Sequence, residues 1–85
     1  MTFVKICGIT NLPDALVAVS EGADALGFNF YRNSSRYIEP LEARRIIEQL
    51  PSNILTVGVF VNEETPEQAK AVASAAGVSA LQLHG

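Results

Sequence analysis

Short apolar runs and longer stretches with helical periodicity alternate along this 85-residue chain. The apolar runs are Phe3–Cys7, Ala25–Phe30, Ile54–Val61 and Ala80–Leu83, and each of them predicts a buried strand. Between the runs lie windows in which apolar residues recur at i, i+3, i+4 and i+7, the spacing of an amphipathic helix. These residues are Leu12, Ala15, Leu16 and Val19, then Ala43, Ile46, Ile47 and Leu50, then Ala69, Val72, Ala73 and Ala76.

The boundaries of the expected helices carry signals of their own. Thr65-Pro66-Glu67-Gln68 has the form of a capping box with proline at the first helical position. Asn11 is expected to cap the first helix, and Pro40 to open the second. Gly22 and Gly77 stand where left-handed turns would end the first and third helices.

Alternating strands and helices predict parallel strands joined by right-handed crossovers. One parity of the strands is apolar and is expected to face the helices: Val4, Ile6, Leu26, Phe28, Val57, Val59, Leu81 and Leu83. The opposite parity mixes glycine with polar groups: Lys5, Cys7, Gly27, Asn29, Gly58, Phe60, Gln82 and His84. Such a face suits a barrel interior near its mouth, whereas the alternative, an open flavodoxin-like sheet, prefers apolar residues on both faces. A complete barrel needs about 200 residues or more. Residues 1–85 are therefore expected to form the first half of a single (β/α)8 barrel domain.

Composition narrows the class of protein. Apolar residues make up 48% of the chain and charged residues 18%, which fits a globular core. The net charge of −3 and the lack of a Lys/Arg cluster argue against nucleic acid or an anionic membrane as the partner. The longest apolar run is too short to cross a bilayer, and no secretory signal is evident. We expect a cytoplasmic protein.

Cys7 is the only cysteine and stands at the end of a predicted strand, where α/β folds present reacting groups. By itself, a cysteine in an apolar run is more often a small buried hydrophobic residue. Lys5 lies on the same strand face and would favour a reactive thiolate there. The alternative for Lys5 is a strand-end lysine whose head group lies in solvent.

Three segments resemble the phosphoribosylanthranilate isomerase family. They are Lys5-Ile6-Cys7-Gly8-Ile9-Thr10 with Asp14-Ala15, Gly27-Phe28 through Ser35-Arg36-Tyr37, and Leu81-Gln82-Leu83-His84-Gly85. Val57-Gly58-Val59-Phe60 also fits the third strand of that family. The resemblance spans the whole chain without a gap. Ser35 departs from the pattern, since the family often has proline before the arginine.

The resemblance implies an Amadori rearrangement in which phosphoribosylanthranilate, an aminoaldose, becomes an aminoketose without a cofactor or a metal. By resemblance, Cys7 is the general base and Arg36 binds the anthranilate carboxylate. The general acid of the family is an aspartate at the end of a later strand, and glycine-rich loops after the last strands hold the phosphate. Both would lie beyond Gly85, so the resemblance implies that the 85 residues alone are inactive.

Other residues receive smaller roles. Gln82 and His84 are expected to line the site and bind the substrate, and Lys5, Asn29 and Phe60 are expected to touch the substrate as well. Asp14 is expected to act in helix capping. The remaining charged residues considered are expected to be solvated: Arg32, Arg44, Arg45, Glu63 and Glu64.

Two further interpretations stay open. One is a non-catalytic half-barrel that associates, through its open strand edges, with itself or with a missing C-terminal half. The other is a different phosphosugar barrel, such as an indole-glycerol-phosphate synthase or a pentose-phosphate epimerase. Cys7 argues against that second interpretation, because such enzymes would not need a thiol there.

Overall fold

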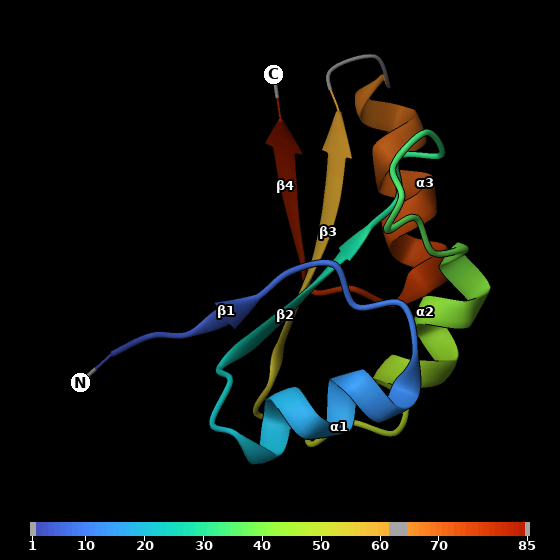
Figure 1. The fold of residues 1–85 in the computed structure, drawn as a ribbon. Helices are drawn as coiled ribbons and strands as arrows, with labels where there is room; N and C mark the ends of the chain where they lie inside the picture. The colour runs from blue at the N-terminus through green and yellow to red at the C-terminus, as the bar shows by residue number, and fades with distance from the viewer. Residues whose placement is uncertain (1, 62–64, 85) are drawn as a thin grey trace.

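The structure, a computed structural model, describes residues 2–61 and 65–84, and of His84 only the backbone. Strands and helices alternate along it (Figure 1). The elements are β1 (Lys5–Ile6), α1 (Leu12–Ser20), β2 (Ala25–Asn29), α2 (Pro40–Ile47), β3 (Leu55–Val61), α3 (Pro66–Ala76) and β4 (Ala80–His84). The four strands form one sheet in the order β1-β2-β3-β4, and each neighbouring pair is parallel.

The strand order decides between the two folds considered from the sequence. A doubly wound sheet reverses its strand order at a switch point and carries helices on both faces. Here the strands keep their chain order, and α1, α2 and α3 all lie on the same side of the sheet (Figure 1). This is the arrangement of the first half of a (β/α)8 barrel, so the fold predicted from the sequence is confirmed. We call the side without helices the inner face.

The helices begin and end at the predicted signals. Asn11 Oδ1 accepts a hydrogen bond of 2.8 Å from the Asp14 backbone N–H, and the Asn11 amide donates to the Asp14 carboxylate at 3.0 Å. Thr65 and Gln68 form a reciprocal capping box, with bonds of 3.0 and 3.2 Å. The two glycines expected after helices both have left-handed φ angles, 98° at Gly22 and 80° at Gly77.

The core lies between the sheet and the helices, and it corrects the assignment of the β3 faces. Paired residues of parallel strands share a face, and the register pairs Phe28 with Gly58 and Asn29 with Val59. Gly58 and Phe60 therefore face the helices. Phe60 is fully buried, and its ring centroid lies 5.4 Å from that of Phe30. The predicted contact of Phe60 with substrate is wrong, because the large ring fills the core.

Val57 and Val59 lie on the inner face instead of the predicted helix face. One parity of β3 contains valines and the other contains Thr56, Gly58 and the large apolar Phe60, so the sequence pattern does not decide which parity faces the helices. The outer layer has the volume for an aromatic ring, and the smaller valines suit the concave inner face.

Three local features differ from what the apolar pattern of the sequence predicts. β1 is shorter than predicted because only two of its residues pair with β2, although Val4 O still accepts a hydrogen bond of 2.8 Å from Asp24 N–H. Helix α2 ends at Ile47, and Leu50 packs on the core from the following turn. Leu16, expected to be buried, is 47% exposed on α1.

Apolar side chains are exposed on both edge strands. Val4 and Ile6 beside β2, and Leu81 and Leu83 beside β3, are between 38% and 61% exposed. By register, Leu81 and Leu83 lie on the helix side of the sheet. The outer edges of β1 and β4 have no further strand beside them among the described residues. In the part of the chain described, the sheet therefore ends on two apolar, unpaired edges.

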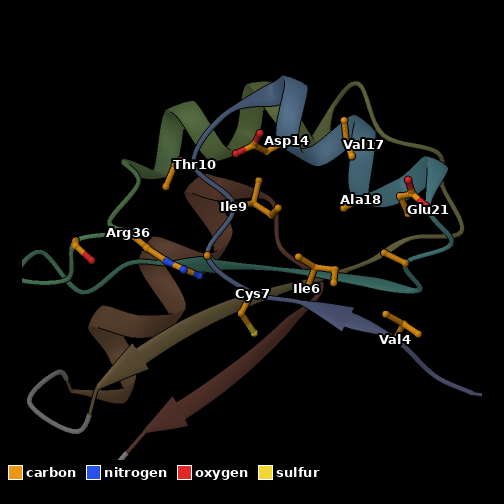
Figure 2. A pocket seen from close by; sticks show the side chains of 13 residues that line it. Val4, Ile6, Cys7, Ile9, Thr10, Asp14, Val17, Ala18, Glu21 and Arg36 are labelled. Carbon is orange, nitrogen blue, oxygen red and sulfur yellow. The ribbon is translucent and has the colours of Figure 1, made fainter.

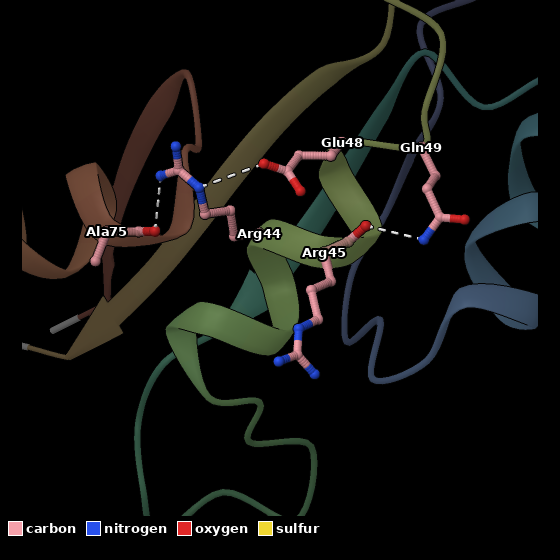
Figure 3. A network of polar contacts seen from close by, with 5 residues as sticks. All are labelled: Arg44, Arg45, Glu48, Gln49 and Ala75. Carbon is pink, nitrogen blue, oxygen red and sulfur yellow. Dashed lines mark hydrogen bonds and ion pairs between the residues drawn. The ribbon is translucent and has the colours of Figure 1, made fainter.

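Helices α2 and α3 are tied by a polar contact (Figure 3). Arg44 Nη1 donates a hydrogen bond of 3.1 Å to the carbonyl oxygen of Ala75 in the last turn of α3. Arg44 Nε also lies 3.5 Å from Glu48 Oε2, and Arg45 pairs with Glu42 at 3.1 Å. All four charged side chains are at least half exposed, as predicted for the arginines. Arg44 additionally supplies a donor to a carbonyl that the helix end leaves without one.

Glu63 and Glu64, predicted as a solvated turn, lie outside the described residues. Over residues 2–61 and 65–84, none of the helices has the length and apolar character needed to cross a membrane.

Candidate functional site

The carboxyl ends of β1 and β2 bring Cys7 and Arg36 together. Cys7 follows β1 directly and is exposed, and Gly8 after it has a φ of 79°. Arg36 Cδ and Nη1 lie 2.5 and 2.8 Å from the point that a Cβ atom of Gly8 would occupy. The missing side chain of Gly8 therefore lets Arg36 lie across the backbone directly after Cys7 (Figure 2).

The loop after β2 is held by side-chain hydrogen bonds that present Arg36. Asn29 Oδ1 accepts a bond of 2.9 Å from Tyr31 N–H, and Asn29 Nδ2 donates to Ser34 Oγ at 3.2 Å. The same Ser34 Oγ accepts a bond of 3.1 Å from Arg36 N–H. Asn29 thus holds the loop through both ends of its amide. Its expected contact with substrate stays a prediction.

The guanidinium of Arg36 is available to a ligand. Arg36 is exposed, and within residues 2–61 and 65–84 its side chain has no hydrogen-bond or ion-pair partner. A guanidinium fork matches a carboxylate with two parallel hydrogen bonds, which the ammonium of lysine cannot reproduce. A carboxylate bound there would lie beside the Cys7 thiol.

Lys5 crosses the inner face of the sheet. Its Nζ donates a hydrogen bond to Gln82 Oε1, which joins the first strand to the last. Lys5 Cε lies 3.4 Å from the Cβ position of Gly27, and Cys7 Sγ lies 3.2 Å from the same point. The lysine stem and the thiol therefore pack side by side over Gly27. The alternative of a head group free in solvent is wrong, and a positive charge near the thiol is supported.

Gln82 lies on the inner face, as predicted, because the register pairs it with Val59 and pairs Val59 with Asn29. His84 is paired with Val61 at the end of β4, but its side chain lies outside the described residues. The lining role expected for His84 stays a prediction. Lys5, Cys7 and Gln82 thus share the inner face, with Arg36 reaching over from the loop.

A groove of about 600 Å³ runs between β1 and α1 (Figure 2). Its walls include Val4 and Ile6 on the outer side of β1 and Val17 on α1. Cys7 and Arg36 border the groove, but the thiol points away from α1 while Ile6 points toward it (Figure 2). The groove lies on the helix side of the edge strand β1, and the Cys7 thiol points to the other side of that strand. We therefore place the chemistry on the inner face.

Sequence reasoning missed two residues that shape this site. Ser34 stands in a polar loop, and nothing in the pattern separates it from the adjacent Ser35. Gly27 was predicted only as one residue of the inner face, and the structure shows that Cys7 and Lys5 occupy the space above it. In the described part of the chain, no cluster of three or more His, Cys, Asp or Glu residues could hold a metal ion.

Comparison with known proteins shows to which family this chain belongs. The family model of N-(5'phosphoribosyl)anthranilate (PRA) isomerase matches residues 4–85. The chain belongs to this family. An N-(5'-phosphoribosyl)anthranilate isomerase of Thermotoga maritima is 60% identical over all 85 residues.

Solved isomerases of the family have the same fold over the whole chain. One, in complex with reduced 1-(o-carboxyphenylamino)-1-deoxyribulose 5-phosphate, is 59% identical and superposes with a TM-score of 0.95; this chain covers 43% of it. Another comes from the dimeric isomerase of Thermotoga maritima, studied as monomers. It is 58% identical with a TM-score of 0.92, and 42% of it is covered. The chain spans 41% of the length of the curated Thermotoga maritima relative.

The hydrogen bonds of Ser34 give a test of how the Arg36 loop is held. Ser34→Ala removes two of them, worth about 1–2 kcal/mol together. Trypsin is therefore expected to cleave after Arg32 and Arg36 about 5–30-fold faster, because the loop opens more often. Ser35→Ala is the matched control, since the Ser35 side chain makes no hydrogen bond among the described residues. Equal cleavage rates in the two variants would contradict a holding role for Ser34.

Proposed function

We propose that this chain is the N-terminal half-barrel of an N-(5'-phosphoribosyl)anthranilate isomerase and carries the general base and the carboxylate anchor of its site. The observation that carries the proposal is the placement of Arg36, without a partner among the described residues, across Gly8 and beside Cys7. Residues 1–85 would then be one part of a single (β/α)8 domain. The substrate would be phosphoribosylanthranilate, an aminoaldose that bears a carboxylate.

The reaction transfers a hydrogen from C2 to C1 of the sugar. A general acid protonates the ring oxygen of the ribose, and the ring opens to a Schiff base between C1 and the nitrogen. The Cys7 thiolate then removes the proton from C2, which gives an enolamine. The enolamine takes up a proton at C1 and releases the proton of its C2 hydroxyl group, and the product is the ketone. The substrate nitrogen accepts the electron pair, so the step balances without a metal or a redox cofactor.

The inner-face residues support this division of roles. Arg36 would hold the anthranilate carboxylate and so fix the C2 proton near Cys7. Lys5, whose ammonium donates a hydrogen bond to Gln82, brings a positive charge close to the Cys7 thiol. Lys5 and Gln82 would line the sugar from below. Roles for Asn29 and His84 at the rim belong to the same proposal.

The general acid is not supplied by the aspartates of this chain. There are two of them, Asp14 in α1 and Asp24 at the amino end of β2. Asp24 accepts a hydrogen bond of 2.8 Å from Val4 N–H, at the opposite end of the sheet from Cys7. We propose that the acid and the phosphate site lie in the part of the relatives that this chain does not cover.

The decisive test compares two proteins: the isolated 85-residue chain and the complete translation product of the gene that encodes it. Turnover of freshly formed phosphoribosylanthranilate is followed by the loss of its fluorescence. We expect the complete product to be active and the isolated chain to be at least about 10²–10⁴-fold slower, because a general acid is missing. An inactive complete product that is folded would overturn the proposed function.

The second candidate, a half-barrel that assembles through its edges, is favoured by the exposed apolar residues of β1 and β4. We propose that these edges pair with the remaining strands in a complete barrel, and with other copies when the chain is alone. Light scattering of the isolated chain is expected to give dimers or larger species. A stable monomer would contradict pairing between copies.

A different phosphosugar barrel is disfavoured by the thiol at the end of β1 and by the family match. A location in the cytoplasm stays a prediction.

A further inference from the structure

Gly27 lies in the middle of β2, directly beneath the reacting group of the proposed site. Its carbonyl oxygen accepts hydrogen bonds of 3.1 Å from both Gly8 N–H and Ile9 N–H, the two residues that follow Cys7. The turn that carries the thiol is therefore fastened to β2 at this one carbonyl group. No other backbone group of β2 receives two bonds from that turn among the described residues.

The side-chain position of Gly27 is equally crowded. A Cβ atom there would lie 3.2 Å from Cys7 Sγ, 3.4 Å from Cys7 Cα and 3.4 Å from Lys5 Cε. The contact with Cys7 Sγ is tight without being prohibitive, and the two contacts at 3.4 Å lie at the limit of ordinary van der Waals contact. Alanine therefore fits only if the thiol gives way by a few tenths of an ångström, and it would leave the lysine stem no spare room. Gly27 is thus a point where a strand glycine admits a close neighbour.

We propose that Gly27 is a positioning residue for the reaction: it sets the place of the Cys7 thiol and leaves the path by which Lys5 reaches Gln82. The inference rests on the proposed function, because it assigns Gly27 a part in the proton transfer by Cys7. Gly27 itself touches no substrate in this account.

Among residues 2–61 and 65–83, few charged groups lie near the thiol. Lys5 comes from β1 itself and Arg36 from the loop after β2, while the register neighbours on the inner face of β2 and β3, Gly27 and Val57, carry no charge. A Cβ atom at Gly27 would therefore change how the thiol lies relative to Lys5 and Arg36. The reactivity of the thiol at a given pH reports on that change directly.

The test measures Gly27→Ala in the complete translation product, by turnover and by the rate of Cys7 alkylation with iodoacetamide at a fixed pH. We expect kcat to fall about tenfold with KM within about twofold, since a misplacement of about 1 Å costs about a hundredfold. We also expect the alkylation rate to change, because the thiol moves relative to its neighbours. Unchanged kcat and an unchanged alkylation rate would overturn the inference.

Gly58→Ala is the matched control on the neighbouring strand. Its Cβ atom would meet the rings of Phe30 and Phe60 at 3.0 Å, on the helix side of the sheet. It is expected to lower the thermal midpoint of unfolding while the alkylation rate of Cys7 stays unchanged. A change in the alkylation rate equal to that of Gly27→Ala would mean that both variants act through general loosening, and would overturn the inference.

Lys5→Met keeps the length of the stem and removes its charge, and it is expected to change the alkylation rate as well. In the double variant with Gly27→Ala the two effects should not add, because they act through the same contact. If Gly27→Ala is not recovered folded, Lys5→Met becomes the deciding variant, and an unchanged alkylation rate in it would overturn the inference. Alkylation also separates the two proposals: a changed alkylation rate in a folded protein without isomerase turnover would refute the proposed function, while Gly27 would still be shown to position the thiol.

Discussion

Replacing Cys7 with alanine in the complete translation product is expected to lower kcat for isomerisation by about 10²–10⁴-fold, with little change in KM. In the proposed mechanism, the Cys7 thiolate is the group that takes the C2 proton. Arg36, the proposed carboxylate anchor, remains in place in the variant. Steady-state turnover at saturating substrate measures the effect, and Cys7→Ser is expected to lose nearly as much, because a hydroxyl is a far weaker base.

The loss of activity in Cys7→Ala can be attributed to the missing thiol and not to unfolding. Cys7 is exposed, so truncating it leaves no cavity in the core, and the thermal midpoint of unfolding should stay unchanged. Turnover within threefold of the unmodified enzyme in Cys7→Ala would remove the thiol from the mechanism. The proton transfer would then need another base on the inner face.

Replacing Arg36 with methionine is expected to lower kcat/KM by about 10–150-fold, mostly through KM. The estimate converts the 1.5–3 kcal/mol typical of a hydrogen bond to a charged group into a ratio. Arg36→Lys should recover only part of the loss, since an ammonium cannot form the two-point contact. Substrate titrations over a wide concentration range separate KM from kcat.

Two comparisons decide whether the loss belongs to the substrate carboxylate. With N-(5'-phosphoribosyl)aniline, which lacks that carboxylate, Arg36→Met and the unmodified enzyme should perform alike, as in a double-mutant cycle. Arg32→Met, an exposed arginine of the same loop, is the control and should leave both substrates unaffected. A loss for Arg36→Met that is equally large on both substrates would place its role elsewhere.

Much of the architecture was accessible from local sequence signals. The Thr65 capping box and the left-handed glycines Gly22 and Gly77 lie where their chemistry required, because these effects involve neighbours within one turn. The alternation of short apolar runs with helical periodicity was enough for a parallel sheet. The resemblance of the segments around Cys7 and Arg36 pointed to the family that the comparisons confirm.

The sequence could not determine which parity of β3 faces the helices. Val57 and Val59 match Gly58 and Phe60 in apolar character, so only the register with β2 and β4 decides. The hydrogen bond between Lys5 and Gln82 could not be predicted from the sequence for a related reason. It joins residues 77 positions apart, and no local pattern encodes such a contact.

The sequence by itself determined the elements, their order, the parallel half-barrel and the residue types that carry the proposed chemistry, because periodicity, caps and a short motif are local properties. The tertiary structure alone decided which faces meet, how Ser34 and Asn29 hold the loop of Arg36, and how Gly27 makes room for Cys7 and Lys5. These contacts depend on strand register, on side-chain volume and on hydrogen-bond partners from other segments of the chain. They form only when the strands lie side by side, so no local sequence pattern encodes them.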